Sequence, residues 1–154
     1  MNPGMMFGAK AYAAVGLETD VATASPHELI LLLYDGVLKC IRDARSALAN
    51  QDIRLKCDHV SKAVRIIDEG LRSSIDTSVG GTLPDQLMSL YDYVSREMLL
   101  ASLRNEDAKF AHCAEIMDEL RQAWAGIPTG NNSNNTNSAP GYGAKSYGGN
   151  AMTY

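Results

Sequence analysis

Apolar residues recur every three or four positions along four stretches of this chain, and that spacing is typical of amphipathic α-helices. The first stretch opens with Ser25-Pro26-His27-Glu28. The serine can cap a helix, the proline suits its first turn, and the glutamate can complete a capping box. A helix is therefore predicted to begin there and to end at Asn50-Gln51-Asp52. Its predicted core seam consists of Leu29, Leu33, Val37, Cys40, Ala44 and Leu48.

Three more helices are predicted to follow after short connections. The second keeps a heptad pattern, with Ile53, Cys57, Val60, Val64, Ile67 and Leu71 on its seam, and Gly80-Gly81 ends it. The third starts near Pro84 with a seam of Leu87, Tyr91, Val94, Met98 and Ala101. The fourth carries Phe110, Cys113, Met117, Leu120 and Trp124 and stops at Gly126. Helices joined by short turns run antiparallel, so the sequence predicts an all-α, up-down four-helix bundle.

The bundle is predicted to occupy residues 25–127 as one domain, because a chain of 154 residues suits one compact domain with tails. Residues 1–24 include Met5, Met6 and Phe7 but no strong helix cap, so we expect a flexible N-terminal segment. Residues 128–154 are rich in Gly, Asn and Ser, and Lys145 is their only charged side chain. That composition predicts a disordered tail.

Several classes of function are disfavoured by charge and hydropathy. A formal net charge of −4 argues against nucleic acid, which is bound through clustered Lys and Arg. The longest strongly apolar run, Leu29 to Tyr34, is far shorter than a membrane span. The N-terminus lacks the basic start and continuous apolar region of a secretory signal, so we expect a cytoplasmic protein.

No constellation of residues indicates catalysis or metal binding. The Glu-x-x-His pairs that hold metals in helical bundles do not occur, since Ala24, Lys56 and Lys109 precede the three histidines by three positions. We find no phosphate loop, nucleophile elbow or zinc spacing. The sequence therefore predicts no catalytic residue, no metal and no cofactor, and indicates that the protein is not an enzyme.

Apolar residues beyond the four seams predict a binding surface. They form three groups: Ile30, Tyr34 and Leu38 on the first helix; His59, Ala63, Ile66 and Gly70 on the second; and Tyr93 and Leu100 on the third. Extra apolar stripes of this kind are typical of proteins that hold a partner helix in a groove. Two alternatives stay open, because a wide bundle could bury these residues internally and two copies could bury them in a homodimer.

Motifs in this chain resemble the flagellar secretion chaperone family, FliS. They are Ala11-Tyr12, Thr23-Ala24-Ser25-Pro26-His27-Glu28-Leu29, Leu33-Tyr34-Asp35-Gly36, Ile66-Ile67-Asp68-Glu69-Gly70-Leu71, Gly80-Gly81, Leu90-Tyr91-Asp92-Tyr93 and Leu103-Arg104-Asn105. The resemblance covers about residues 10–127, and it implies a cytoplasmic four-helix chaperone of the flagellar type III export system. Its implied partners are the disordered C-terminal region of flagellin, whose premature polymerisation it prevents, and a component of the export gate.

The resemblance also places the segment around Tyr12 at the flagellin-binding surface. Together with the apolar stripes, it predicts a binding set of Tyr12, Val15, Ile30, Tyr34, Leu38, Ala63, Ile66, Gly70, Tyr93 and Leu100. The N-terminal segment would cover this surface until a client arrives. The alternative function is a structural or signalling bundle that uses the same apolar surface to associate with itself.

Overall fold

The computed structural model describes residues 24–76, 78 and 80–128. Within that part of the chain it contains four α-helices and no strand: α3 (Pro26–Ala49), α4 (Ile53–Arg65), α5 (Leu83–Arg104) and α6 (Asp107–Ala125). A short π-helix, η1 (Ile66–Leu71), and a 3-10 turn, η2 (Arg72–Ser74), extend α4. The predicted all-α fold is therefore confirmed.

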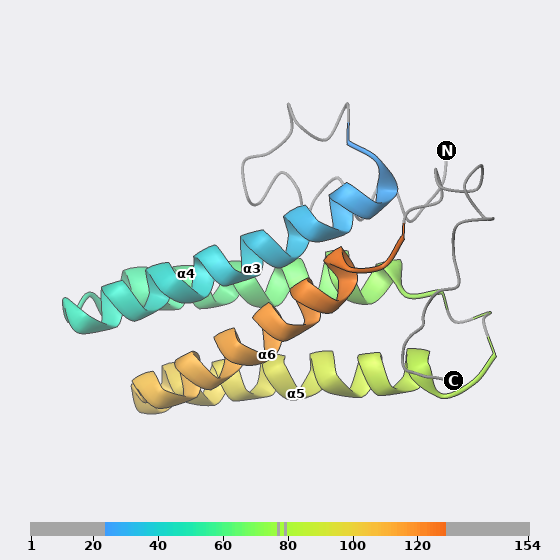
Figure 1. Cartoon of the computed structure of the whole chain (residues 1–154). Coiled ribbons are helices and arrows are strands. Elements are labelled where there is room, and N and C mark those ends of the chain that lie inside the picture. Colours follow the sequence, from blue (N-terminus) through green and yellow to red (C-terminus); the bar gives the residue numbers. More distant parts are fainter. Residues whose placement is uncertain (1–23, 77, 79, 129–154) are drawn as a thin grey trace, which may run out of the picture.

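The four helices pack in a ring. Helix α3 lies against α4 and α6, and α5 lies against α4 and α6. Each helix runs opposite to the one before it, so that the α3–α4 and α5–α6 turns share one end of the molecule (Figure 1). Because of this ring order, the α3–α6 side and the α4–α5 side are opposite faces of the bundle.

Local signals explain where the helices begin and turn. The backbone N–H of Glu28 donates to Ser25 Oγ at 3.2 Å, and the Ser25 N–H donates to Glu28 Oε1 at 2.9 Å. This is the predicted capping box, and its hydrogen bonds from Ser25 lower the pKa of Glu28. The α5–α6 turn depends on Asn105, which adopts the left-handed conformation with φ 55° that asparagine tolerates better than most residues.

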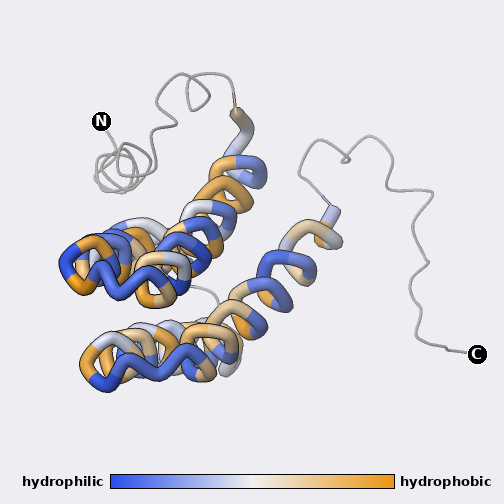
Figure 2. Tube along the Cα trace, turned by 90° about the vertical axis from the view of Figure 1, so that its left-hand side faces the viewer, coloured by the Kyte–Doolittle hydropathy of each residue, from blue (hydrophilic) through white to orange (hydrophobic). Residues whose placement is uncertain are grey.

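The core follows the predicted seams on α3, α5 and α6. Hydrophilic and apolar residues alternate along each helix (Figure 2). The buried apolar residues of the four helices form one cluster. The fully buried large side chains include Leu33, Ile41, Ile66, Ile67, Met98, Phe110 and Met117. The side chains of Tyr34 and Tyr91 also lie in this core, where their hydroxyl oxygens are 2.6 Å apart.

The second helix differs from its prediction in two ways. Its predicted seam began with Ile53 and Cys57, but Ile53 is 47% exposed and Cys57 is exposed as well. The buried position in this turn is Lys56, whose ammonium donates to the carbonyl oxygen of Ser102 at 2.6 Å and to Asn105 Oδ1 at 2.5 Å. The carbonyl of Ser102 lies in the last turn of α5, where carbonyl groups have no partner within their own helix. The buried ammonium of Lys56 supplies the missing donor.

The π-helix is the second difference. Its i→i+5 hydrogen bonds add a residue to the helical turn and shift the buried face. Two consecutive pairs, Ile66 with Ile67 and Gly70 with Leu71, are buried as a result. The helical path ends at Ser74, earlier than the predicted end at Gly80-Gly81.

Candidate functional site

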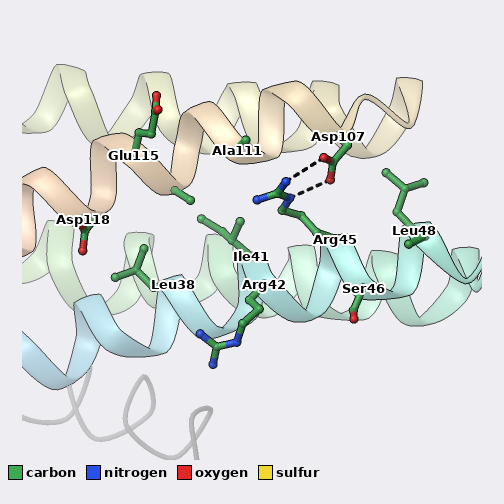
Figure 3. A pocket seen from close by; sticks show the side chains of 12 residues that line it. Leu38, Ile41, Arg42, Arg45, Ser46, Leu48, Asp107, Ala111, Glu115 and Asp118 are labelled. Atoms are coloured by element: carbon green, nitrogen blue, oxygen red, sulfur yellow. Dashed lines mark hydrogen bonds and ion pairs between the residues drawn. The ribbon is translucent and has the colours of Figure 1, made fainter.

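A groove runs along the surface between α3 and α6. It has a volume of about 960 Å³, and Figure 3 shows Leu38 and Ile41 pointing from α3 toward α6. The facing positions of α6 are Ala111 and Ala114, and Leu48 extends the apolar lining toward the α3–α4 turn. The groove exists because leucine and isoleucine on one helix meet alanines on the other, which leaves space beside the closed core.

Two ion pairs connect α3 and α6, one within this groove and one beyond it. Near the turns, Arg45 donates to Asp107 through Nε at 2.8 Å and through Nη2 at 2.9 Å, a bidentate contact drawn in Figure 3. Beyond the other end, Arg121 donates to Asp35 through its Nε and Nη2. The Arg45 contact lowers the pKa of Asp107, and the Asp35 contact raises the pKa of Arg121. Both pairs are largely exposed, so each contributes little to folding.

The rim of the groove is more acidic than basic once these pairs are set aside. Asp118 and Glu115 belong to α6, and neither forms an ion pair with any residue of the described part of the chain. Asp118 points toward α3 in Figure 3, whereas Arg42 of α3 points away from α6. The groove therefore offers an apolar floor and a carboxylate on the α6 side.

The far end of the α3–α6 contact is closed by an aromatic pair. The rings of His27 and Trp124 stack with centroids 5.1 Å apart and planes inclined by 17°. The indole Nε1–H of Trp124 donates to the backbone oxygen of His27 at 3.0 Å. This contact fixes the end of α6 to the start of α3, so the two walls of the groove are held together at both ends.

Comparisons with known proteins identify the family. A family model described as flagellar protein FliS matches residues 8–131. The chain belongs to the FliS family. Flagellar secretion chaperone FliS of Salmonella typhimurium is 39% identical over 120 residues, which are 78% of this chain and 89% of the relative. The Escherichia coli FliS is 35% identical over 117 residues, covering 76% and 86%, and FliSB of Pseudomonas aeruginosa is 34% identical over 118 residues, covering 77% and 93%.

The family predicted from the motifs is thereby confirmed. The chain is a flagellar secretion chaperone of the FliS family, which is a family of chaperones and not of enzymes. In the described residues no helix is long and apolar enough to cross a membrane. No cluster of three or more metal-ligating side chains occurs in that same part of the chain.

The predicted binding residues of α3 lie at different depths in this FliS fold. Leu38 lines the α3–α6 groove, and Ile30 is half-buried against the core. Tyr34 is 3% exposed, because its hydroxyl bonds that of Tyr91 across the core. Of the ridge predicted to form a binding surface, Tyr34 is therefore part of the core and Leu38 is at the surface.

The stripe predicted on the second helix is not an open surface. Ala63 and Ile66 are 0% exposed and Gly70 is buried, while His59 is half-buried. The buried positions of this helix are spaced by three or four residues from Lys56 through Val60 and Ala63 to Ile66 and Ile67, so these side chains are part of the core. The interpretation of this stripe as unused apolar surface is wrong for the chain as folded here, and its role in binding stays a prediction.

The remaining predicted residues lie elsewhere. Tyr93 and Leu100 are half-buried on α5, and the Tyr93 ring meets His112 of α6 edge to face, with its oxygen 3.2 Å from Nε2. Tyr93 also lines a smaller hollow of about 490 Å³ beside the first half of α5. Tyr12 and Val15 lie outside the described residues, as do the N-terminal cover and the tail after 128.

The α6 side of the groove lies outside the predicted binding set. Ala111, Ala114 and Asp118 were not part of the predicted binding set, because alanine carries little apolar surface and an acid on a helix usually faces water. The available signal was the combination of small residues three apart with an acid four positions further on. Small side chains on one helix face leave room for a partner, and an acid beside them places a negative charge at the edge of that space.

Proposed function

We propose that this FliS-family protein is a cytoplasmic export chaperone that binds the disordered C-terminal region of flagellin. In this role it prevents premature polymerisation of flagellin and delivers it to the flagellar type III export apparatus, where it contacts a component of the export gate. The main support is the family, whose similar members are named flagellar secretion chaperones. The apolar groove supplies a physical means of holding a client.

The α3–α6 groove is the part of the molecule best suited to the client. An amphipathic helix can place its apolar side in a groove and gain the free energy of burying that side and the groove floor together. The groove is open in the folded chain, whereas the stripe of Ala63 and Ile66 on the second helix is closed by the core. Docking in the groove requires no opening of the bundle.

The other predicted binding residues enter the proposal as secondary contacts. Residues 1–24, with Tyr12 and Val15, would cover the groove before the client binds and would contact the client afterwards. Tyr93 and Leu100 would extend the surface onto α5. The segment after 128 would take no part in holding the client.

The client assignment is tested by co-purification of this protein with flagellin from the same organism. Intact flagellin should co-purify in a one-to-one complex, and flagellin that lacks its C-terminal region should not. Equal recovery of the two flagellins would refute the assigned binding region, and recovery of neither would refute the client.

The groove is tested by filling it. Ala114→Trp puts a large ring where the floor now leaves space, and we expect binding of flagellin to weaken at least about tenfold, or 1.4 kcal/mol. Ala123→Trp is the matched control, because Ala123 is exposed on the same helix and does not line the groove. That control should bind within about twofold of the unmodified protein. Equal affinities for the two variants would place the client on another surface.

A second candidate function, self-association, is favoured by one observation. Leu99 is 53% exposed and Leu103 is 78% exposed, and the two leucines lie one turn apart on α5. Two copies could bury these leucines in a homodimer, as a structural or signalling bundle would. Light scattering at increasing concentration separates the two functions, because a client-binding monomer keeps its mass and a self-associating bundle does not.

A further inference from the structure

We infer that the α3–α6 groove selects a client segment by charge as well as by apolar surface, and that it takes a helix of about three turns with a basic side chain facing Asp118. This inference rests on the proposed function, since it specifies which flagellin segment the groove accepts. It goes beyond an apolar docking site because it names the polar partner the segment must supply.

The length follows from the two ion pairs that bridge the groove. Asp35 and Arg45 lie on α3 about ten residues apart, which corresponds to about 15 Å of helix. Each is joined to α6, by Arg121 and by Asp107 respectively, so the two pairs bridge the helices on either side of Leu38, Ile41 and Arg42. A helix lying between them without breaking either pair has room for about three turns.

The charge expected on the client follows from the carboxylate of Asp118, which forms no ion pair in the described part of the chain. Arg45 and Arg121 are occupied by Asp107 and Asp35. Arg121 makes no direct ion pair with Asp118, and the Asp118 charge adds only the smallest contribution to the raised pKa of Arg121. Gln122 donates to one oxygen of Asp118 at 2.7 Å, which leaves the other oxygen without a protein donor in the described part of the chain. A lysine or arginine on the client can approach this oxygen from the groove, whereas an acidic side chain there would be repelled.

A second copy of this chain is a poorer occupant on the same grounds. The helix that would present a matching face, α6, carries Glu115, Asp118 and Glu119 on its exposed positions. Those carboxylates would meet the same acids of the first copy. A basic amphipathic segment from another protein avoids this repulsion.

The test uses a purified C-terminal fragment of flagellin and three forms of the full chain: unmodified, Asp118→Lys and Glu119→Lys. Glu119 is an exposed acid on the same helix that does not line the groove, so its variant makes the same change in net charge elsewhere. We expect Asp118→Lys to weaken binding of the fragment by about tenfold at low salt and Glu119→Lys to change it less than about twofold. Circular dichroism of each variant checks that the helices remain intact.

The charge partner is then located on the client. Each Lys and Arg of the fragment is replaced singly by Glu, and one replacement should weaken binding to the unmodified protein and restore binding to the Asp118→Lys variant. Hydrogen exchange on the bound fragment should protect a continuous stretch of about ten residues around that position. The loss caused by Asp118→Lys should also shrink as salt is raised, because exposed charges are screened.

The outcomes separate this inference from the proposed function. If the unmodified protein does not bind the fragment, the proposed function and this inference fail together. If it binds but both lysine variants weaken it equally, or neither does, only the charge selection is overturned. A dimer of the unmodified chain that dissociates in Asp118→Lys would identify a second copy as the occupant and would also overturn the inference.

Discussion

The hydroxyl pair between Tyr34 and Tyr91 should show strong energetic coupling. Both side chains are 3% exposed, and their oxygens are 2.6 Å apart. Replacing either tyrosine by phenylalanine leaves the other hydroxyl buried without its partner, which costs about 1–3 kcal/mol of unfolding free energy. Replacing both removes the unmet hydroxyl as well, so the double variant should lose only about 0–1.5 kcal/mol.

The assay for this coupling is urea unfolding of the unmodified protein, the two single variants and the double variant, followed by circular dichroism. The coupling energy, which is the sum of the two single losses minus the loss in the double variant, should exceed about 1 kcal/mol, with the urea dependence unchanged. Tyr93→Phe is the control, because the Tyr93 oxygen bonds an exposed histidine and its loss should cost less than about 1 kcal/mol. A double variant that loses the sum of the two single effects would show that the hydroxyls do not depend on each other.

Two further predictions concern buried polar groups. Lys56→Met keeps the aliphatic stem but removes the donor to Ser102, so we expect a loss of about 1–3 kcal/mol in urea unfolding, against less than about 0.5 kcal/mol for the exposed Lys39→Met. An unchanged midpoint for Lys56→Met would show that relief of the buried charge offsets the lost hydrogen bonds. Burial raises the pKa of Cys113 to about 12 and also raises the pKa of Tyr91. Because a raised folded-state pKa favours the protonated form, the contribution of these two groups to stability should be constant below about pH 8.5 and be lost as pH rises toward about 12. Urea unfolding at about pH 8 and at about pH 10.5 should show this decrease.

The helices could be predicted from the sequence because their signals are local. The capping box at Ser25 and Glu28 uses residues three apart, and the seams of α3, α5 and α6 repeat within one turn of helix. The second helix was predicted less well because its buried face depends on distant partners. Lys56 is placed in the core by acceptors 46 and 49 residues away, and no pattern within α4 indicates them.

The candidate site was harder to predict than the fold for a related reason. Tyr34 and Ile66 were predicted to lie on the binding surface because they are apolar residues outside the predicted core seams. In the structure the Tyr34 hydroxyl bonds that of Tyr91, 57 residues away, and Ile66 is buried at the π-helix. The groove instead arises where small side chains face large ones across two helices. Leu38 is the one residue of the predicted binding set that lines the groove. Ala114 could not be predicted from the sequence, because an alanine leaves space for a client only where a large side chain of the neighbouring helix lies opposite it.

The energetic difference between the two candidate docking surfaces favours the groove. A client that used the stripe on α4 would first have to uncover Ala63 and Ile66, and re-exposing a side chain of the size of isoleucine costs about 1.5–3 kcal/mol before any contact is made. The α3–α6 groove is already open, and the two ion pairs that connect these helices are exposed contacts of about 0.2–1 kcal/mol that the client can leave intact. In the proposed function the protein must also release its client at the export apparatus. A client in the α3–α6 groove can bind and dissociate while the core of the bundle stays closed. The groove therefore costs less free energy to occupy than the stripe with Ala63 and Ile66, and release from it requires no refolding of the bundle.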